Sequence, residues 1–281
     1  RGSRIDWIGC SESWEVRIAQ ILRNSREGRT PSDHFPVTAV LRPKMESHQG
    51  TLRVLSYNIH HGVGTDGKYD LGRIAKILRA WDPDLVALQE VDQETSRSLA
   101  MDQAAMLAEW TGLQYQFFKA IDFDSGYYGQ VILSRLPMSQ AETILLPNEG
   151  SKEQRIAGEV VATFGGRSIR FLTTHFDHTD QNLRLRQADV LAKRCMSMDQ
   201  PVILAGDMNA TPDSPVMARL GEVWEVDEGD TEATFPSAKS SKRIDYILVR
   251  ERDGWSEVGS RSIAEPTASD HHPILRVLRF R

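Results

Sequence analysis

The sequence predicts an α/β (α+β) fold in which two β-sheets pack against each other and helices cover their outer faces. Short apolar runs of strand length recur throughout residues 51–281, whereas amphipathic patterns with a helical period are few. In one unit of this length, many strands and few helices are best accommodated by two packed sheets flanked by helices. Polar residues also follow one apolar run after another, which locates the function at the strand ends.

Composition limits the classes of protein that the chain can belong to. Of the 281 residues, 40% are hydrophobic and 26% are charged, as in globular proteins. The net charge of −5 provides no overall basic surface for nucleic acid or anionic lipid. No apolar run is long enough for a transmembrane helix, and two cysteines form no disulfide framework. The chain begins Arg1-Gly-Ser without an initiator Met, which indicates a processed or partial chain and leaves localisation open.

The beginning of the chain repeats its end. Arg4-Ile-Asp-Trp-Ile8 matches Arg243-Ile-Asp-Tyr-Ile247, and Ser32-Asp-His-Phe-Pro-Val37 matches Ser269-Asp-His-His-Pro-Ile274. The aspartates of the two motifs are 27 residues apart in the first copy and 25 in the second. Two matched motifs at nearly equal spacing indicate a tandem repeat.

We therefore predict that residues 1–42 are the C-terminal remnant of a preceding copy, 43–50 a linker, and 51–281 the complete domain. The remnant is too short to form a core of its own. Three roles stay open for it: pairing at a sheet edge, strand swapping or dimer contact with another molecule, and competition with the second copy.

Four amphipathic stretches predict the helices. Asp70 is placed to cap the first, and Asp82-Pro83 ends it. Gly112 ends the second. The helices are expected at about 70–81, 102–110, 181–194 and 214–220.

The apolar runs predict the strands, and Gly165-Gly166 predicts a hairpin between two of them. The strands are expected at 52–57, 85–88, 114–119, 130–133, 143–146, 158–164, 169–174, 201–205, 245–249 and 273–280.

Polar side chains gather where these strands stop. Pro201 to Ala205 is an apolar run that ends at Gly206 and is followed by Asp207 and Asn209. Asp207 and Asn209 point the same way if the chain stays extended, although a turn in which they bond the backbone explains this stretch equally well. Five further strand ends carry such residues: Asn58, Glu90, His175 with Asp177, Asp245, and Asp270 with His271.

Oxygen-rich strand ends suit a hard divalent cation such as Mg²⁺. The histidines supply proton transfer and phosphate contacts near neutral pH. The sequence has no clustered Cys and no His-x-x-x-His spacing, which argues against a zinc site.

Seven short motifs that include these residues occur in a fixed order. They are Ser56-Tyr-Asn-Ile-His60, Leu88-Gln-Glu-Val91, Ile132-Leu-Ser-Arg135, Thr174-His-Phe-Asp177, Gly206-Asp-Met-Asn209, Arg243-Ile-Asp-Tyr-Ile247 and Ser269-Asp-His-His-Pro273. As a set, they resemble the endonuclease/exonuclease/phosphatase superfamily of deoxyribonuclease-I-like, metal-dependent phosphoesterases. The resemblance spans residues 52–278, and Thr234-Phe-Pro236 is similar to bacterial members. It implies a four-layer sandwich of two facing mixed sheets with outer helices, and an active site where the strand ends converge.

The resemblance also implies a metal site. Glu90 resembles the main metal carboxylate of the family, with Asn58 beside the metal and Asp270 close enough to reach it through water. The implied cofactor is Mg²⁺, with Mn²⁺ as a substitute.

The same resemblance assigns the catalytic residues. His271 resembles the general base that takes a proton from the attacking water, and Asp245 orients it. His175 and Asn209 bind and stabilise the phosphate. Asp207 either positions the water or takes part in the proton transfer.

Some positions depart from the family pattern or add to it. Members often have Gly-Asn before the Ile-Leu-Ser-Arg motif, whereas this chain has Gly129-Gln130, so Tyr128 is the expected phosphate contact. Further polar or aromatic candidates near the site are His60, His61, His178, Arg155, Arg184, Arg186, Tyr127 and Phe176. For the histidines, loop hydrogen bonding is favoured over a second metal. For Arg184 and Arg186, an exposed helix face is favoured.

The motif set predicts Mg²⁺-dependent hydrolysis of a phosphodiester or phosphomonoester by water. A nuclease acting on DNA or RNA with the same site is one alternative, but the acidic chain favours a small or lipid-derived phosphoester. A catalytically silent binding or scaffold module of the same fold is another, and the complete set of site residues argues against it. One active site is expected, because the Asp207 stretch occurs only once.

Overall fold

The computed structural model describes residues 6–11, 14–21, 32–34, 36–43, 48, 50–150, 152–225 and 232–281. The chain forms two compact units, residues 1–47 and 48–281. The boundary falls within the predicted linker, of which residues 44–47 and 49 lie outside the described part.

The first unit contains an antiparallel pair, β1 (Trp14–Ile21) and β2 (Val37–Pro43). The second unit ends in a similar pair, β12 (Trp255–Ser262) and β13 (Ile274–Phe280). Each pair has one irregularity, at Val16/Ile18 and at Glu257/Gly259. The repeat seen in the motifs thus extends to the strand pairing.

The second unit is built on two mixed sheets. The six-stranded sheet has the order β12-β13-β3-β4-β6-β5 and the five-stranded sheet the order β11-β10-β9-β8-β7. The remaining strands of the first sheet are β3 (Leu52–Asn58), β4 (Leu85–Gln93), β5 (Gln114–Phe123) and β6 (Gly126–Ser134). Those of the second are β7 (Met138–Leu145), β8 (Ile156–Phe164), β9 (Arg167–His175), β10 (Val202–Asp207) and β11 (Asp245–Val249).

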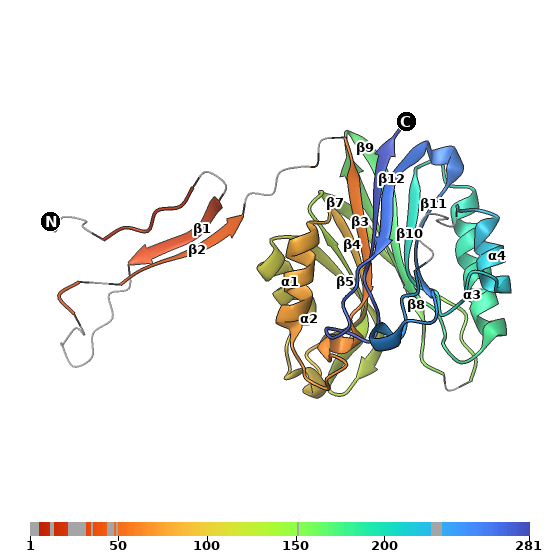
Figure 1. Cartoon of the computed structure of the whole chain (residues 1–281), viewed down its shortest axis with the longest axis horizontal. Coiled ribbons are helices and arrows are strands. Elements are labelled where there is room, and N and C mark those ends of the chain that lie inside the picture. The colour runs from red at the N-terminus through yellow and green to blue at the C-terminus, as the bar shows by residue number, and fades with distance from the viewer. Residues whose placement is uncertain are drawn as a thin grey trace. The chain divides into compact units, whose positions relative to one another are not determined.

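Helices cover the outer faces of the facing sheets, so the unit is the expected four-layer sandwich (Figure 1). On the side of the six-stranded sheet lie α1 (Leu71–Trp81) and α2 (Gln103–Thr111). On the side of the five-stranded sheet lie α3 (Gln181–Met196) and α4 (Pro215–Gly221). Within the described residues, no helix is both long enough and apolar enough to span a membrane.

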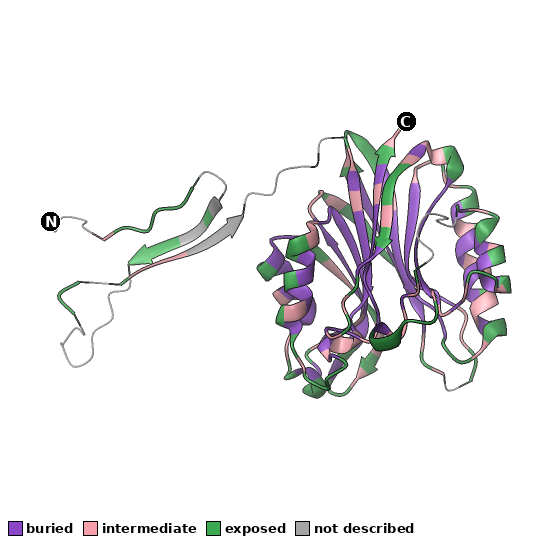
Figure 2. Ribbon diagram, in the orientation of Figure 1, coloured by how far each residue is buried: buried purple, intermediate pink, exposed green. Residues whose placement is uncertain are grey.

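Hydrophobic cores hold the layers together, and the buried strands are visible in Figure 2. The core between the sheets includes Val54 and Ile132 from one sheet and Phe171 and Ile203 from the other. The second core lies under α3 and α4, where Leu191 packs with residues of β10 and β11. Strands with both faces buried read as continuous apolar runs, which is why the sequence reveals them.

The four predicted helices are present, but one predicted capping residue, Asp70, makes no capping hydrogen bond. Asp102 caps α2 by accepting the N–H of Ala105 at 2.9 Å, and Gly112 ends this helix with φ of 77°. Asp70 stands at the start of α1 but makes no capping hydrogen bond. Its carboxylate pairs with the Arg73 side chain at 3.2 Å instead.

The predicted strands are present with shifted ends, and the Gly165-Gly166 hairpin is confirmed, with φ of 55° and 78°. β12 is not among the strands predicted from the sequence. This strand lies at the sheet edge and is mostly exposed, so it lacks the apolar run that marks a buried strand.

Candidate active site

The polar ends of several strands meet at one edge of the facing sheets. His175 ends β9 and Asp207 ends its parallel neighbour β10, so the two residues lie opposite each other. Asp245 begins β11, which is antiparallel to β10, and lies opposite Asp207 on the other side. Asn58 ends β3 of the six-stranded sheet. Strand register therefore gathers residues that are far apart in the sequence.

A cavity of about 420 Å³ opens at this edge. Of the predicted site residues, it is lined by Glu90, Tyr128, His175, Asp207, Asn209, Asp270 and His271. Asn58 and Asp245 are fully buried behind this lining. Each bonds a lining residue: Asn58 bonds Glu90, and Asp245 bonds His271.

Glu90 lies at a bulge within β4, not at the strand end that the sequence predicted. β4 continues to Gln93, and its pairing with β6 shifts between Leu88 and Val91. Glu90 itself has φ of 57°, a region uncommon for residues other than glycine. Bulges redirect side chains beside active sites, and here Glu90 lines the cavity.

Asn58 connects two carboxylates of the site. Its Nδ2 donates to Glu90 Oε1 at 2.9 Å and to Asp207 Oδ2 at 3.2 Å. Its Oδ1 accepts the backbone N–H of His60 at 3.1 Å and keeps a second lone pair. Asn58 therefore orients Glu90 from behind.

The sequence predicts that Asp207 and Asn209 point the same way if the chain stays extended to Asn209. The chain does not stay extended that far. β10 ends at Asp207, and Asn209 has φ of 46°. Asp207 Oδ1 accepts the N–H of Asn209 at 2.8 Å, which is the turn given as the alternative. Both side chains line the cavity all the same. Asn209 Nδ2 donates one hydrogen to the carbonyl of Phe176 at 3.1 Å and keeps its second.

His271 pairs with the buried carboxylate of Asp245. Its Nδ1 lies 2.9 Å from Asp245 Oδ2, and its Nε2 lies 3.7 Å from Asp207 Oδ2. The Thr234-Phe-Pro236 motif supports this pair. The Phe235 ring lies 4.8 Å from the His271 ring, and Thr234 Oγ1 accepts the N–H of Asp245 at 3.4 Å.

Burial and charge act in opposite directions on His271. Burial disfavours the imidazolium, but the carboxylates of Asp245 and Asp207 outweigh it and raise the pKa of His271 to about 10. Burial, followed by the charge of Asp245, raises the pKa of Asp207 to about 7. A divalent cation among these carboxylates would oppose their charge and lower the pKa of His271, so cation binding and proton loss are coupled.

His175 is kept neutral. Burial, and next the charge of Arg155, holds its pKa well below the usual value. Arg155 Nη1 lies 3.0 Å from His175 Nδ1. Because a guanidinium only donates, Nδ1 accepts and Nε2 carries the proton. This Nε2 lies 3.5 Å from Asp207 Oδ2, where it can donate to an anionic oxygen.

Some of the other candidates line the cavity, and one connects the two sheets instead. His60, His61, His178 and Arg155 line the cavity. Gln130 does not, because its Nε2 donates to the carbonyl of Ile156 at 3.0 Å and its Oε1 accepts from Thr173 at 3.1 Å. It ties the two sheets together.

Several candidates lie outside this cavity. Phe176 is buried in the core under α3, and Tyr127 borders a different surface pocket. Asp177 accepts hydrogen bonds from the segment leading into α3, including the N–H of Asp180 at 2.7 Å. Arg184 donates to the carbonyl of Asp177, and Arg186 pairs with Glu149 at the surface.

Arg97 is a cavity residue that the sequence did not predict. This residue lies in the turn Ser96–Ser98 and lines the cavity. Its guanidinium makes two bonds of 2.7 Å to Asp92 and lies 4.3 Å from the centre of the Phe123 ring. A single Arg in a polar loop has no periodicity or motif, so only the folded chain reveals its position.

The first unit repeats the Asp–His pair. His34 Nδ1 lies 3.0 Å from the Asp6 carboxylate, as His271 Nδ1 lies 2.9 Å from Asp245. The repeated pair is exposed, whereas the pair in the cavity is buried. The Asp245–His271 pair therefore differs from the Asp6–His34 pair in its burial and in its neighbouring site residues, not in the bond itself.

Within the described residues, two groups of His and acidic side chains bring possible ligand atoms within 4.8 Å of one another. One is Asp207, Asp245 and His271; the other is His60, His61 and Glu90. Glu90 and Asp270 also border the same cavity. The site therefore has the acidic and imidazole ligands that a divalent metal requires.

Comparison with known proteins agrees with this architecture. Residues 55–271 match the model of the Endonuclease/Exonuclease/phosphatase family. Because the match covers most of the chain, the protein belongs to the endonuclease/exonuclease/phosphatase family, as its motifs predicted. This family consists of phosphoester hydrolases and nucleases that in general depend on a divalent metal.

Solved structures share the fold. An endonuclease/exonuclease/phosphatase from Beutenbergia cavernae DSM 12333 has 23% identity and a TM-score of 0.69, over 82% of this chain and 72% of that one. A mannosyl-6-phosphatase from Bacteroides thetaiotaomicron VPI-5482 has 20% identity and a TM-score of 0.67, over 82% and 100%. The human Nocturnin catalytic domain with bound sulfate has 18% identity and a TM-score of 0.67, over 83% and 95%. Comparison with curated protein sequences found no match.

Proposed function

We propose that this protein is a Mg²⁺-dependent phosphoesterase that hydrolyses a phosphodiester or phosphomonoester by attack of water on phosphorus. The observation that carries the proposal is one cavity that is lined by His175, His271 and Asp207 together with the carboxylates of Glu90 and Asp270. Donors for an anionic oxygen, acceptors for a proton and ligands for a cation are the parts that such a reaction needs.

In this proposal, Glu90 and Asp270 hold the cation, with Asn58 beside them. Their donors are hard oxygens, which fit Mg²⁺ and its substitute Mn²⁺. The bound cation supplies positive charge against the phosphoryl oxygens.

The chain's own residues bind the phosphate and move the proton. His175 donates from Nε2 to a phosphoryl oxygen, and Asn209 donates the amide hydrogen that the Phe176 carbonyl does not use. Tyr128 adds a hydroxyl contact from β6. His271, oriented by Asp245 and deprotonated when the cation binds, takes the proton of the attacking water. As the new P–O bond forms, the ester P–O bond breaks, and the leaving oxygen takes up a proton from His271 or solvent. Asp207 positions that water, since its Oδ2 lies within 4 Å of both histidines.

We further propose a small or lipid-derived phosphoester as the substrate. The cavity of about 420 Å³ suits a compact head group. Its two arginines, Arg97 and Arg155, each have a carboxylate partner and form no extended basic groove. A fold neighbour is named a mannosyl-6-phosphatase.

A substrate panel tests the proposal. The full chain is assayed with bis-p-nitrophenyl phosphate, sugar phosphates, inositol phosphates, sphingomyelin, DNA and RNA, each with Mg²⁺, Mn²⁺ or EDTA. We expect EDTA-sensitive hydrolysis of a small or lipid-derived substrate, abolished by Glu90→Ala and by His271→Ala. Turnover restricted to DNA or RNA identifies the nuclease instead. Protein that binds Mg²⁺ in calorimetry but hydrolyses none of these substrates is the silent binding module.

A further inference from the structure

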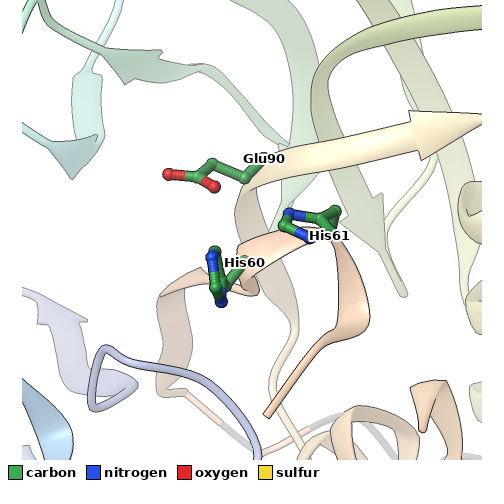
Figure 3. A group of neighbouring side chains, drawn as sticks. All are labelled: His60, His61 and Glu90. Carbon is green, nitrogen blue, oxygen red and sulfur yellow. The ribbon is translucent and has the colours of Figure 1, made fainter. Parts of the chain in front are cut away.

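His60 and His61 face Glu90 beside the proposed Mg²⁺ site. The two histidines form the turn His60–Gly62 after β3, and Glu90 comes from the bulge in β4. Possible ligand atoms of the three side chains lie within 4.8 Å of one another, and all three line the cavity. Figure 3 shows the imidazole rings on one turn and the Glu90 side chain reaching over them from the neighbouring strand.

His60 is oriented as a metal-binding histidine is. Its Nδ1 lies 3.1 Å from the carbonyl oxygen of Val63. A carbonyl only accepts, so Nδ1 carries the hydrogen and Nε2 keeps its lone pair. Metal-binding histidines commonly donate their second ring N–H to a carbonyl or carboxylate in this way. Asp270 Oδ1, 3.9 Å from the same Nδ1, adds negative charge behind the ring.

His61 and Glu90 each keep a ligand atom available. In the part of the chain that the structure describes, no hydrogen bond engages the His61 ring. Its backbone is fixed, because Gln103 Nε2 donates to the His61 carbonyl at 2.7 Å. Glu90 has two carboxylate oxygens: Oε1 accepts from Asn58 and keeps a lone pair for the proposed Mg²⁺, and Oε2 is available to a second cation.

The backbone holds all three residues in the left-handed region. The φ angles are 45° at His60, 44° at His61 and 57° at Glu90. Such conformations persist where surrounding contacts enforce them, and they cluster at functional sites. Asn58 Oδ1 accepts the N–H of His60, and the His60 carbonyl accepts the N–H of Val63 at 2.9 Å. The turn thereby brings adjacent imidazoles together, with ring centres 4.5 Å apart.

We propose that His60, His61 and Glu90 form a second cation site, which binds a divalent transition-metal ion. Two imidazole nitrogens and a carboxylate oxygen suit Zn²⁺ and Co²⁺, whereas Mg²⁺ takes oxygen ligands. Three protein ligands leave a position open for water or substrate, as in catalytic metal sites. The nearby positive charge of Arg97 is balanced by its two bonds to Asp92.

Metal binding to this site can be measured without hydrolysis, so the test is a binding measurement. Full-length protein is stripped of metal with EDTA, exchanged into saturating Mg²⁺, and titrated with Zn²⁺ by calorimetry and with Co²⁺ by visible absorption. His60→Asn and His61→Asn remove the imidazoles and keep a residue that tolerates the left-handed region. His178→Asn is the matched control, because His178 lines the same cavity but is not one of the three ligands.

We expect each of the two variants to lower Zn²⁺ affinity by at least about 100-fold, since even loss of an outer partner of a ligand costs 10–100-fold. The Co²⁺ absorption bands should disappear with it, while His178→Asn retains both signals. Unchanged affinity in His60→Asn and His61→Asn, or an equal loss in His178→Asn, would overturn the proposal. Circular dichroism verifies that each variant is folded. Failure of the substrate panel leaves this result intact, because no turnover is measured.

Discussion

His271 lies between two buried carboxylates, and these determine the tautomer and the protonation of its imidazole ring. Asp245 holds Nδ1 at 2.9 Å, while Asp207 lies 3.7 Å from Nε2. A carboxylate behind an imidazole fixes its tautomer and stabilises the charge that forms when the ring takes a proton. The exposed Asp6–His34 pair in the first unit has the same bond without the buried surroundings.

The two pairs supply a matched test of the proton-transfer role. Asp245→Asn keeps the shape of the side chain but removes the charge that orients His271. We expect kcat to fall by about 10²–10⁴-fold, the range of general acid–base catalysis, with little change in KM. Asp6→Asn is the control and should leave both constants unchanged. Equal rates in Asp245→Asn and wild type would show that the pair is only structural.

The pKa of His271 also predicts how stability changes with pH. Without a bound cation, the folded protein keeps the His271 proton up to about pH 10, whereas an unfolded histidine loses it near pH 6.5. The stabilisation from this proton is therefore complete below pH 6.5 and is lost as the pH rises towards 10. One proton corresponds to a slope of at most about 1.4 kcal/mol per pH unit.

Urea unfolding in EDTA at a series of pH values measures this slope. We expect the free energy of unfolding of wild type to decline between pH 6.5 and 10 more steeply than that of His271→Gln. Parallel curves for the two proteins would contradict the assigned protonation of His271.

At the scale of elements, β10 positions Asp207 through its contact with β9. Gly206 has φ of 152°, and a Cβ there would lie 2.0 Å from the carbonyl oxygen of Thr174 in the neighbouring strand. The glycine of the Gly206-Asp-Met-Asn209 motif is thus required by close backbone approach.

Gly206→Ala should separate β10 from β9 and displace Asp207. We expect the free energy of unfolding to fall by about 1–3 kcal/mol, as for other overpacked sites, and hydrolysis to fall with it. Gly221→Ala at the end of α4 is the control, because nothing lies within 4 Å of its Cβ position and its φ is not positive. Chemical denaturation should show it unchanged or slightly stabilised. Equal stability of the two variants would contradict the close approach.

At the scale of the whole molecule, all the proposed site residues belong to the second unit. The six- and five-stranded sheets, the hydrophobic cores described above and the cavity lie within residues 48–281. The first unit contributes a strand pair and one Asp–His pair, but no counterpart of Glu90, His175 or Asp207.

Deletion of residues 1–47 should therefore leave hydrolysis and the unfolding temperature of the second unit unchanged. The measurement is Mg²⁺-dependent turnover with the substrate identified in the panel, together with thermal unfolding and the molecular mass in solution. A large loss of turnover would show that the first unit completes the working site. A change in mass alone would assign it to contact between molecules.

The sequence by itself determined the layers and supplied the residues of the candidate site. Buried strands must be apolar on both faces, so β3, β4, β9 and β10 are visible as apolar runs, and their ends are marked by the polar residues that follow. The ordered motifs then identified the family. The sequence did not predict the edge strand β12, because this strand is mostly exposed. It did not predict the bulge at Glu90 either, because a bulge depends on how β4 pairs with β6.

Only the tertiary structure decided which side chains lie together. Asp207 lies beside His175 and Asp245 because of strand register, and Arg97 reaches the cavity from a loop without any motif. For His60 and His61, the sequence alone favours loop hydrogen bonding over a second metal. Their third partner, Glu90, comes from another strand, and the left-handed backbone that joins them is a property of the folded chain. Distances between residues remote in sequence depend on packing, which local patterns do not encode.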